Sequence, residues 1–137
     1  MDIDFQTIHR TFIRNFIPAE DQEQAVSELV HAKNRSLFID RLTNESGQLL
    51  DKVVVKPMDP DILNRAAIRS ELQISERGLC YVISTNTALD DKVMEFNTVF
   101  DKIYDQGYNT IILNLRGSAL YAEFTTSGSA ERLIGRK

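Results

Sequence analysis

Gly78-Leu-Cys-Tyr-Val-Ile-Ser84, Thr110-Ile-Ile-Leu-Asn-Leu115 and Ala119-Leu-Tyr-Ala-Glu-Phe124 are the three runs that decide the fold. Each is short and rich in β-branched or aromatic residues, which favours strands. Gly117-Ser118 separates the last two runs and predicts a hairpin with a two-residue loop, in which glycine takes the positive φ angle. Because the run 110–115 is apolar on both faces, we expect a central strand with a helix on one side.

The segment between the first two runs predicts a polar loop over 84–91 and then a helix that ends at Gly107. Asn97, or Asp90 one or two turns earlier, is expected to cap the start of this helix. Its apolar residues recur three and four positions apart and predict a buried stripe: Phe96, Val99, Phe100, Ile103 and Tyr104.

The N-terminal part of the chain predicts two helices. The first runs from about Asp4 to Phe16, since Phe5, Ile8, Phe12 and Phe16 recur at helical spacing. Pro18 disfavours helical geometry at the residue before it and suits the first turn of a second helix. We predict that this second helix extends from Ala19 to about Lys33.

The middle and the end of the chain are less regular. Residues 36–42 and 48–56 predict two strands of a hairpin around a turn at 44–47. Residues 61–74 suit both a helix, with Asp59 as cap and Pro60 in the first turn, and an alternating strand; we read a short helix that becomes a strand near Ile68. Residues 131–137 predict either a last strand or a frayed tail.

Length and composition indicate one domain. A chain of 137 residues with 42% apolar residues can bury a core of its own, so we expect a single α+β domain over 1–137, with 128–137 as a possible tail. We expect five to six mainly antiparallel strands, two N-terminal helices and one long helix on the sheet. No signal peptide or apolar run of membrane-spanning length is recognisable, so we expect a cytoplasmic protein without membrane contact.

Few residues predict chemistry. Cys80 lies inside an apolar strand, which is typical of a buried structural thiol rather than a nucleophile. The only histidines, His9 and His31, have no second histidine or cysteine at metal spacing. We therefore expect no catalytic set, no metal and no cofactor.

The distribution of charge is more informative than the net charge of −4. Residues 17–32 carry four carboxylates and no lysine or arginine, and residues 87–107 carry five carboxylates against two lysines. Acidic helices disfavour nucleic acid and favour a basic protein partner. Our first hypothesis is a non-enzymatic binding protein of the inhibitor, immunity or adaptor type. Its expected contact residues are Glu20, Asp21, Glu23, Glu28, Asp101 and Asp105.

Two alternatives remain. A loop between a strand and a helix often holds a ligand in α/β proteins, so an enzymatic or small-molecule site is expected around Ser84, Asn86, Asp90 and Asp91. A homodimer is the other alternative. The first helix carries more aromatic residues on one face than a terminal helix usually needs, and a second copy of the chain could cover that face.

Overall fold

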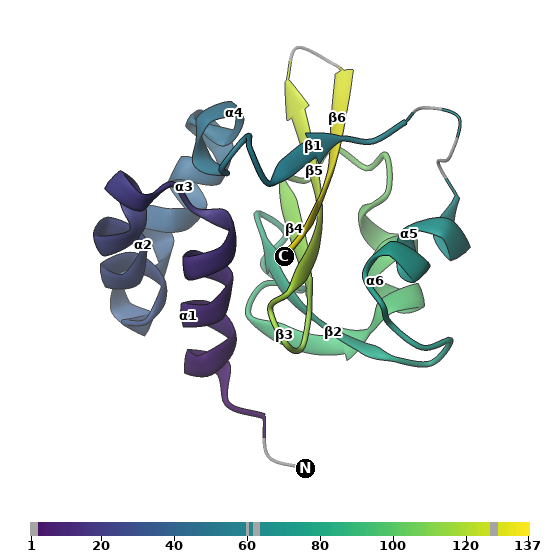
Figure 1. The fold of residues 1–137 in the computed structure, drawn as a ribbon, viewed down its shortest axis with the longest axis horizontal. Helices are drawn as coiled ribbons and strands as arrows, with labels where there is room; N and C mark the ends of the chain where they lie inside the picture. Colours follow the sequence, from purple (N-terminus) through teal and green to yellow (C-terminus); the bar gives the residue numbers. More distant parts are fainter. Residues whose placement is uncertain (1–2, 60, 62–63, 127–128) are drawn as a thin grey trace.

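The computed structural model describes residues 3–59, 61, 64–126 and 129–137. The fold has three layers: one antiparallel sheet lies between two layers of helices (Figure 1). Helices α1 (Phe5–Phe16), α2 (Gln22–Leu29), α3 (Arg35–Asn44) and α4 (Ser46–Leu49) cover one face, which we call face 1. Helices α5 (Arg65–Glu71) and α6 (Phe96–Ile103) cover the other, face 2. The predicted α+β class is confirmed.

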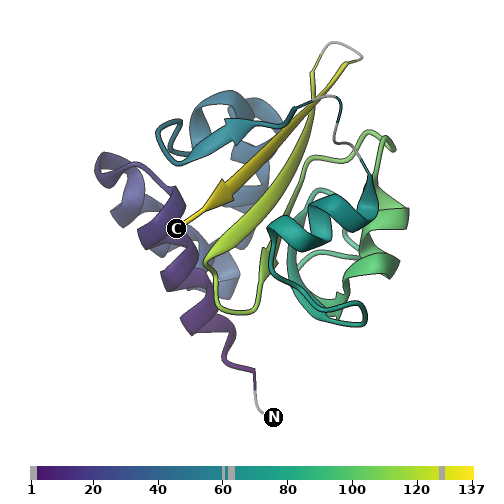
Figure 2. The same ribbon diagram turned by 45° about the vertical axis from the view of Figure 1, so that its right-hand side comes forward.

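The sheet has the strand order β1-β6-β5-β4-β2-β3, and each neighbouring pair is antiparallel. Two hairpins, β2–β3 and β5–β6, are joined through the central strand β4, and α6 crosses from β3 over face 2 to β4. Figure 2 shows this crossing with α5 and α6 turned forward. The strands are β1 (Val55–Pro57), β2 (Leu79–Ser84), β3 (Lys92–Glu95), β4 (Thr110–Asn114), β5 (Ala119–Thr126) and β6 (Ser129–Arg136).

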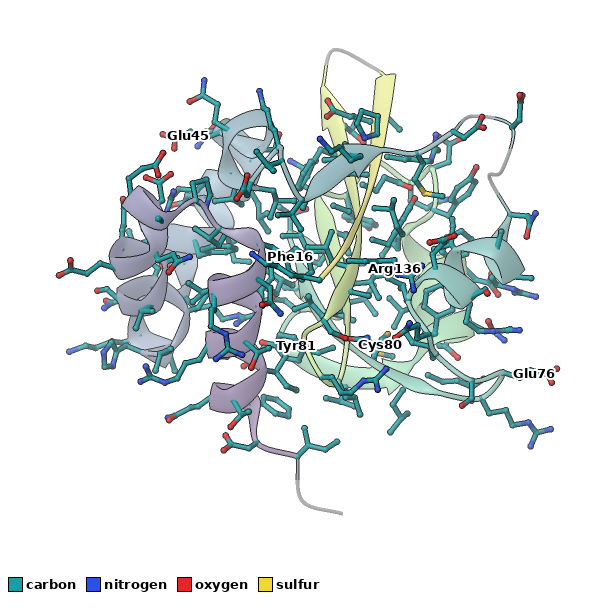
Figure 3. The ribbon with its side chains drawn as sticks, viewed as in Figure 1. Phe16, Glu45, Glu76, Cys80, Tyr81 and Arg136 are labelled. Atoms are coloured by element: carbon teal, nitrogen blue, oxygen red, sulfur yellow. The ribbon has the colours of Figure 1, made fainter. Side chains whose placement is uncertain are left out.

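Alternating side chains divide the core into two halves. On β2, Tyr81 and Ile83 point to face 1, whereas Cys80 and Val82 point to face 2. Figure 3 shows Tyr81 on the side of α1 and Cys80 on the opposite side. β4 is central, as predicted, but helices cover it on both sides rather than on one, which explains why the run is apolar at every position.

The first helix is confirmed. α1 begins after Asp4, whose carboxylate accepts hydrogen bonds from the backbone N–H groups of Gln6 and Thr7 at 3.0 and 3.3 Å. The predicted second helix is shorter than expected: α2 is flanked by the 3-10 turns Ala19–Asp21 and Ala32–Asn34, so that it occupies only the middle of 19–33.

The predicted hairpin over 36–56 is wrong. Residues 35–44 form α3, in which Arg35, Phe38 and Leu42 are buried at helical spacing. The run 36–42 predicted a strand, but Phe38 and Leu42 are fully buried one helical turn apart, whereas Leu37 is 51% exposed. Only the end of the second predicted strand is extended, as β1, and its partner is β6.

The strand predicted near Ile68 is also wrong, because α5 continues to Glu71 and buries Ile68 and Leu72 one turn apart. Asn64, rather than Asp59, caps α5 by accepting a hydrogen bond from the N–H of Ala67 at 2.8 Å. Pro60 lies outside the described residues. The last segment forms the strand β6, so that the alternative of a frayed tail is wrong for 129–136.

The helix before Gly107 is shorter than predicted, since β3 occupies 92–95 and α6 ends at Ile103. Neither Asn97 nor Asp90 caps it. Gly107 has a positive φ of 86°, but it follows the helix by four residues. The β4–β5 hairpin is confirmed with a longer loop than two residues: the N–H of Gly117 bonds to the carbonyl of Asn114 at 3.0 Å, and Gly117 then takes a φ of 68°.

Among the described residues, no helix combines the length and the apolar character that a bilayer crossing requires.

Candidate functional site

A buried polar cluster joins the helical layer of face 1 to the β2–β3 hairpin. Arg35, at the first position of α3, binds both carboxylate oxygens of Asp90 through Nε and Nη2, each at 2.8 Å. The hydroxyl of Tyr81, on β2, donates to Oδ1 of Asp91 at 2.5 Å, and Nε2 of His9, on α1, lies 2.6 Å from the same hydroxyl. We call these five side chains the His9–Arg35 cluster.

The geometry determines the protons of this cluster. Since the hydroxyl of Tyr81 has one proton and donates it to Asp91, its contact with His9 is a hydrogen bond in the tautomer that carries the imidazole proton on Nε2. Nδ1 of His9 then carries the lone pair, and it has no hydrogen-bond partner among the described residues. Nη1 of Arg35 lies 3.4 Å from Nε2 of His9 and 3.6 Å from Oδ1 of Asp91.

Burial and the neighbouring charges set the ionisation of the cluster. Burial, followed by the positive charge of Arg35, lowers the pKa of His9 from 6.5 to about 4, so this histidine is neutral at pH 7. Burial raises the pKa of Tyr81 and keeps the phenol protonated. Burial opposes the charge of Arg35, but the hydrogen bonds and charge of Asp90 outweigh it, and the pKa of Arg35 is raised.

The cluster is built to hold elements together rather than to move a proton to a substrate. In a catalytic relay the nucleophile lies at the accessible end and the orienting carboxylate lies inside. Here the order is reversed: Asp91 has a side chain that is 44% exposed, and His9 is buried at the inner end. We interpret the cluster as a clamp between α1, α3 and the sheet.

The loop residues of the predicted ligand site do come together, but only two of the four line a hollow. Ser84 and Asp90 contribute to a depression of about 270 Å³ that is also lined by Arg35, Ile39 and Thr87. Asp90 reaches the backbone N–H of Ser84 at 2.9 Å, which closes the loop on itself.

The other two predicted ligand residues shape the loop. Asn86 accepts a hydrogen bond from the N–H of Ala88 at 3.0 Å. Asp91 takes a positive φ of 60°, a conformation that favours glycine, and its carboxylate is held by Tyr81. His9 and Arg35 were missed as members of this site because they are distant in the sequence.

The acidic residues of the first hypothesis are divided between two surfaces. Glu20 and Asp21 lie in the 3-10 turn that precedes α2, and Glu23 lies in the first turn of α2; we call this segment the start of α2. Glu20 and Glu23 are exposed, while Asp21 is half-buried. None of the three has an ion-pair partner among the described residues. Glu28, by contrast, is 5% exposed and binds Nη1 of Arg41 at 2.8 Å, which removes it from the surface.

The two acids of the α6 side are exposed but already paired. Asp101 binds Nη1 of Arg65 at 2.9 Å, and Asp105 lies 3.2 Å from Nη2 of Arg132. Figure 1 shows α2 and α6 on opposite sides of the sheet, so the two acidic segments do not form one surface.

The aromatic residues of α1 and the thiol of Cys80 were also considered as candidates in the sequence, and most of them belong to the hydrophobic core. Of the residues expected to attract a second copy, Phe12 and Phe16 are fully buried against face 1, whereas Phe5 is half-buried. Cys80 is fully buried as predicted, and burial raises the pKa of its thiol to about 12. Within the described ranges, no group of three or more His, Cys, Asp and Glu side chains is arranged to hold a metal.

Comparison of the chain with protein-family models, with curated proteins and with solved structures gives no match.

Proposed function

We propose that this chain is a non-enzymatic binding protein that contacts a basic protein partner through Glu20, Asp21 and Glu23, at the start of α2. The observation that carries the proposal is the presence of two exposed acidic residues and one half-buried acidic residue within four positions, with no arginine or lysine bound to them in the described part of the chain. Accessible charges of one sign speed the encounter with an oppositely charged partner. We place this activity in the cytoplasm.

The other acidic residues of the first hypothesis are less suited to bind a partner, because they are already paired with arginines or buried. Asp101 and Asp105 would have to exchange Arg65 and Arg132 for a residue of the partner, which leaves little net gain from such exposed pairs. Glu28 would have to leave Arg41 and a buried position. The proposal is therefore narrower than the whole set of acidic residues and is confined to the start of α2.

The test is a comparison of two charge-neutralised variants. Tagged wild-type protein, the triple variant Glu20→Gln, Asp21→Asn, Glu23→Gln, and the control Asp101→Asn, Asp105→Asn are used to capture proteins from the native cell lysate, which are identified by mass spectrometry. We expect a basic partner that the wild type and the control retain, that the triple variant loses, and whose binding weakens with salt. A partner that the triple variant retains in full would contradict the proposal.

A second candidate function rests on the depression beside Arg35, Ser84 and Thr87. We propose that it binds a small polar molecule through Ser36, Asp40 and Thr87, the exposed residues of its lining. The hydroxyl of Ser84 is already bonded to Thr110, and the carboxylate of Asp90 is already bonded to Arg35. Thr87 is exposed on its rim, so Thr87→Trp fills the hollow without disturbing the core. In ligand-observed NMR with a set of small polar fragments, we expect binding to the wild type that Thr87→Trp abolishes; binding that survives in this variant would contradict the site.

A further inference from the structure

A second hollow, of about 270 Å³, lies between α4, the loop 50–54, β1 and β6. Its walls include the apolar side chains of Leu50, Val55 and Leu133, which are 5%, 4% and 8% exposed. Lys52 and Glu131 are exposed at its rim, and neither has an ion-pair partner in the part of the chain that the structure describes. An apolar hollow with a few charged groups at its edge is the usual form of a binding site for an anchoring side chain.

Hydrogen bonds fix the loop that forms one wall. The backbone carbonyl of Asp51 accepts from the N–H groups of Val54 and Val55 at 3.1 and 2.9 Å, and its carboxylate accepts from the N–H of Val53 at 2.9 Å. The loop therefore does not have to be ordered on binding, which lowers the entropic cost of association. It also holds Val53 outward with 79% of its surface exposed, so an apolar contact stands beside the hollow.

This hollow and the acidic start of α2 lie at the same end of the molecule. The N–H of Asp51 donates to the carbonyl of Phe16 at 2.8 Å, which places the loop against the last residue of α1, four residues before Glu20. Figure 1 and Figure 2 both show the beginning of α2, α4 and β1 at the upper end of the ribbon. One partner can therefore contact both features.

We propose that the hollow receives one apolar side chain of the basic partner, with an adjacent lysine or arginine of that partner meeting Glu131. The inference rests on the proposed function, because it assigns the hollow and the start of α2 to the same partner. The carboxylates Glu20, Asp21 and Glu23 supply long-range attraction, and the hollow supplies the buried contact that gives a complex its lifetime.

The probe is acetyl-Lys-Leu-Lys-amide, titrated into protein labelled at its methyl groups and observed by NMR. We expect shifts of the methyl groups of Leu50, Val55 and Leu133 that acetyl-Lys-Ser-Lys-amide does not cause. We expect Glu131→Lys to weaken the affinity about two- to fivefold, as for an exposed ion pair. The matched control is Glu76→Lys, because Glu76 is exposed and lies on the opposite side of the molecule (Figure 3).

Three results would overturn the inference. The leucine and serine peptides could shift the same methyl groups equally, free leucine could bind as tightly as the peptide, or the mass in solution could rise with concentration as a second copy fills the hollow. For a partner identified in the lysate experiment and lost by the α2 triple variant, an affinity for Glu131→Lys equal to that for the wild type would overturn this inference and leave the proposed function intact. A partner kept by the triple variant would overturn the proposed function. The peptide titration would still test whether the hollow binds an apolar side chain.

Discussion

The two faces of the sheet use the same chemistry in different ways. On each face a buried tyrosine donates to a carboxylate that an arginine accompanies: Tyr81, Asp91 and Arg35 on face 1, and Tyr121, Glu123 and Arg132 on face 2. On face 1 the three groups come from β2, from the loop before β3 and from α3, and His9 adds α1. The cluster on face 1 therefore links elements that are far apart in the sequence.

The cluster on face 2 is more local. Glu123 and Arg132 are direct partners across the β5–β6 ladder, and Tyr121 is two residues from Glu123 on the same strand. Glu123 is fully buried and accepts from the hydroxyl of Tyr121 at 2.8 Å and from the N–H of Asp105 at 2.9 Å. Within this cluster each partner is positioned by a strand pair, whereas the face 1 cluster holds separate helices in place.

The largest expected effect tests whether the two halves of the core contribute alike. Phe12 on face 1 and Phe96 on face 2 are both fully buried, so Phe12→Ala and Phe96→Ala are each expected to lower the free energy of unfolding by about 3–5 kcal/mol. Urea unfolding followed by circular dichroism measures both. A loss below about 1 kcal/mol for either residue would show that its half of the core collapses around the gap.

The two arginines are expected to differ. Arg35→Met leaves the carboxylate of Asp90, whose side chain is 16% exposed, without its bidentate partner, and should cost about 3–5 kcal/mol. Arg132→Met should cost less, about 1–3 kcal/mol, because Arg132 makes a single contact of 3.4 Å with Glu123 rather than two bonds of 2.8 Å. Glu123 also keeps two hydrogen bonds, from Tyr121 and from the N–H of Asp105, whereas Asp90 keeps one, from the N–H of Ser84. The control Arg65→Met breaks an exposed pair and should cost under about 1 kcal/mol. Equal losses for Arg35 and Arg132 in urea unfolding would remove the distinction between the two clusters.

Only the face 1 cluster contains a histidine, so the faces should also differ in their response to pH. The folded pKa of His9, about 4, lies below its ordinary value of 6.5, so the unfolded chain takes up a proton first as the pH falls. Stability should therefore be complete above pH 6.5 and fall by about 3 kcal/mol between pH 6.5 and 4 on account of this residue.

Five charged or titratable neighbours take part in this response: Asp4 before α1, Arg35 of α3, Tyr81 of β2, and Asp90 and Asp91 before β3. His9→Gln keeps a donor toward Tyr81 and removes the titration, so the difference between its pH profile and that of the wild type isolates His9. His31→Gln is the control, because His31 is exposed. If wild type and His9→Gln lose stability in parallel between pH 6.5 and 4, His9 is not the cause.

The smallest effect tests the independence of the two halves. Ile111 and Ile112 are neighbours on β4, but the first packs on face 1 and the second on face 2. Each Ile→Val change should cost about 0.5–1.5 kcal/mol. Because the two side chains share no core, the double variant should cost the sum to within about 0.5 kcal/mol. A larger coupling energy in the double-mutant cycle would mean that the sheet transmits packing changes from one face to the other.

Prediction from the sequence succeeded where a local pattern and the tertiary environment agreed. α1 was recognisable because its apolar period and the following Pro18 both indicate the same helix. It failed at 36–42, which the sequence predicted as a strand and which belongs to α3, because the burial of Arg35, Phe38 and Leu42 at helical spacing could not be foreseen. It missed β3, because four residues with one lysine and one glutamate have no signal of their own and become a strand by pairing with β2.

The candidate sites divide in the same way. The acidity of the start of α2 can be read from consecutive residues, and so can the polar loop 84–91. The partners of each carboxylate cannot, because the arginines that bind Glu28, Asp90 and Asp101 are 13, 55 and 36 residues away in the chain. Which acids remain available for a partner is therefore decided only after folding.

By itself the sequence determined the α+β class, the first helix, the central strand and the burial of Cys80, since each depends on the period of apolar residues along a few turns or one strand. The tertiary structure alone decided that helices cover both faces, that β1 pairs with β6, and that His9, Arg35, Tyr81, Asp90 and Asp91 meet. Those features depend on contacts between segments that are distant in the sequence. No pattern within a single segment predicts such contacts, because the fold of the whole chain decides which side chains meet.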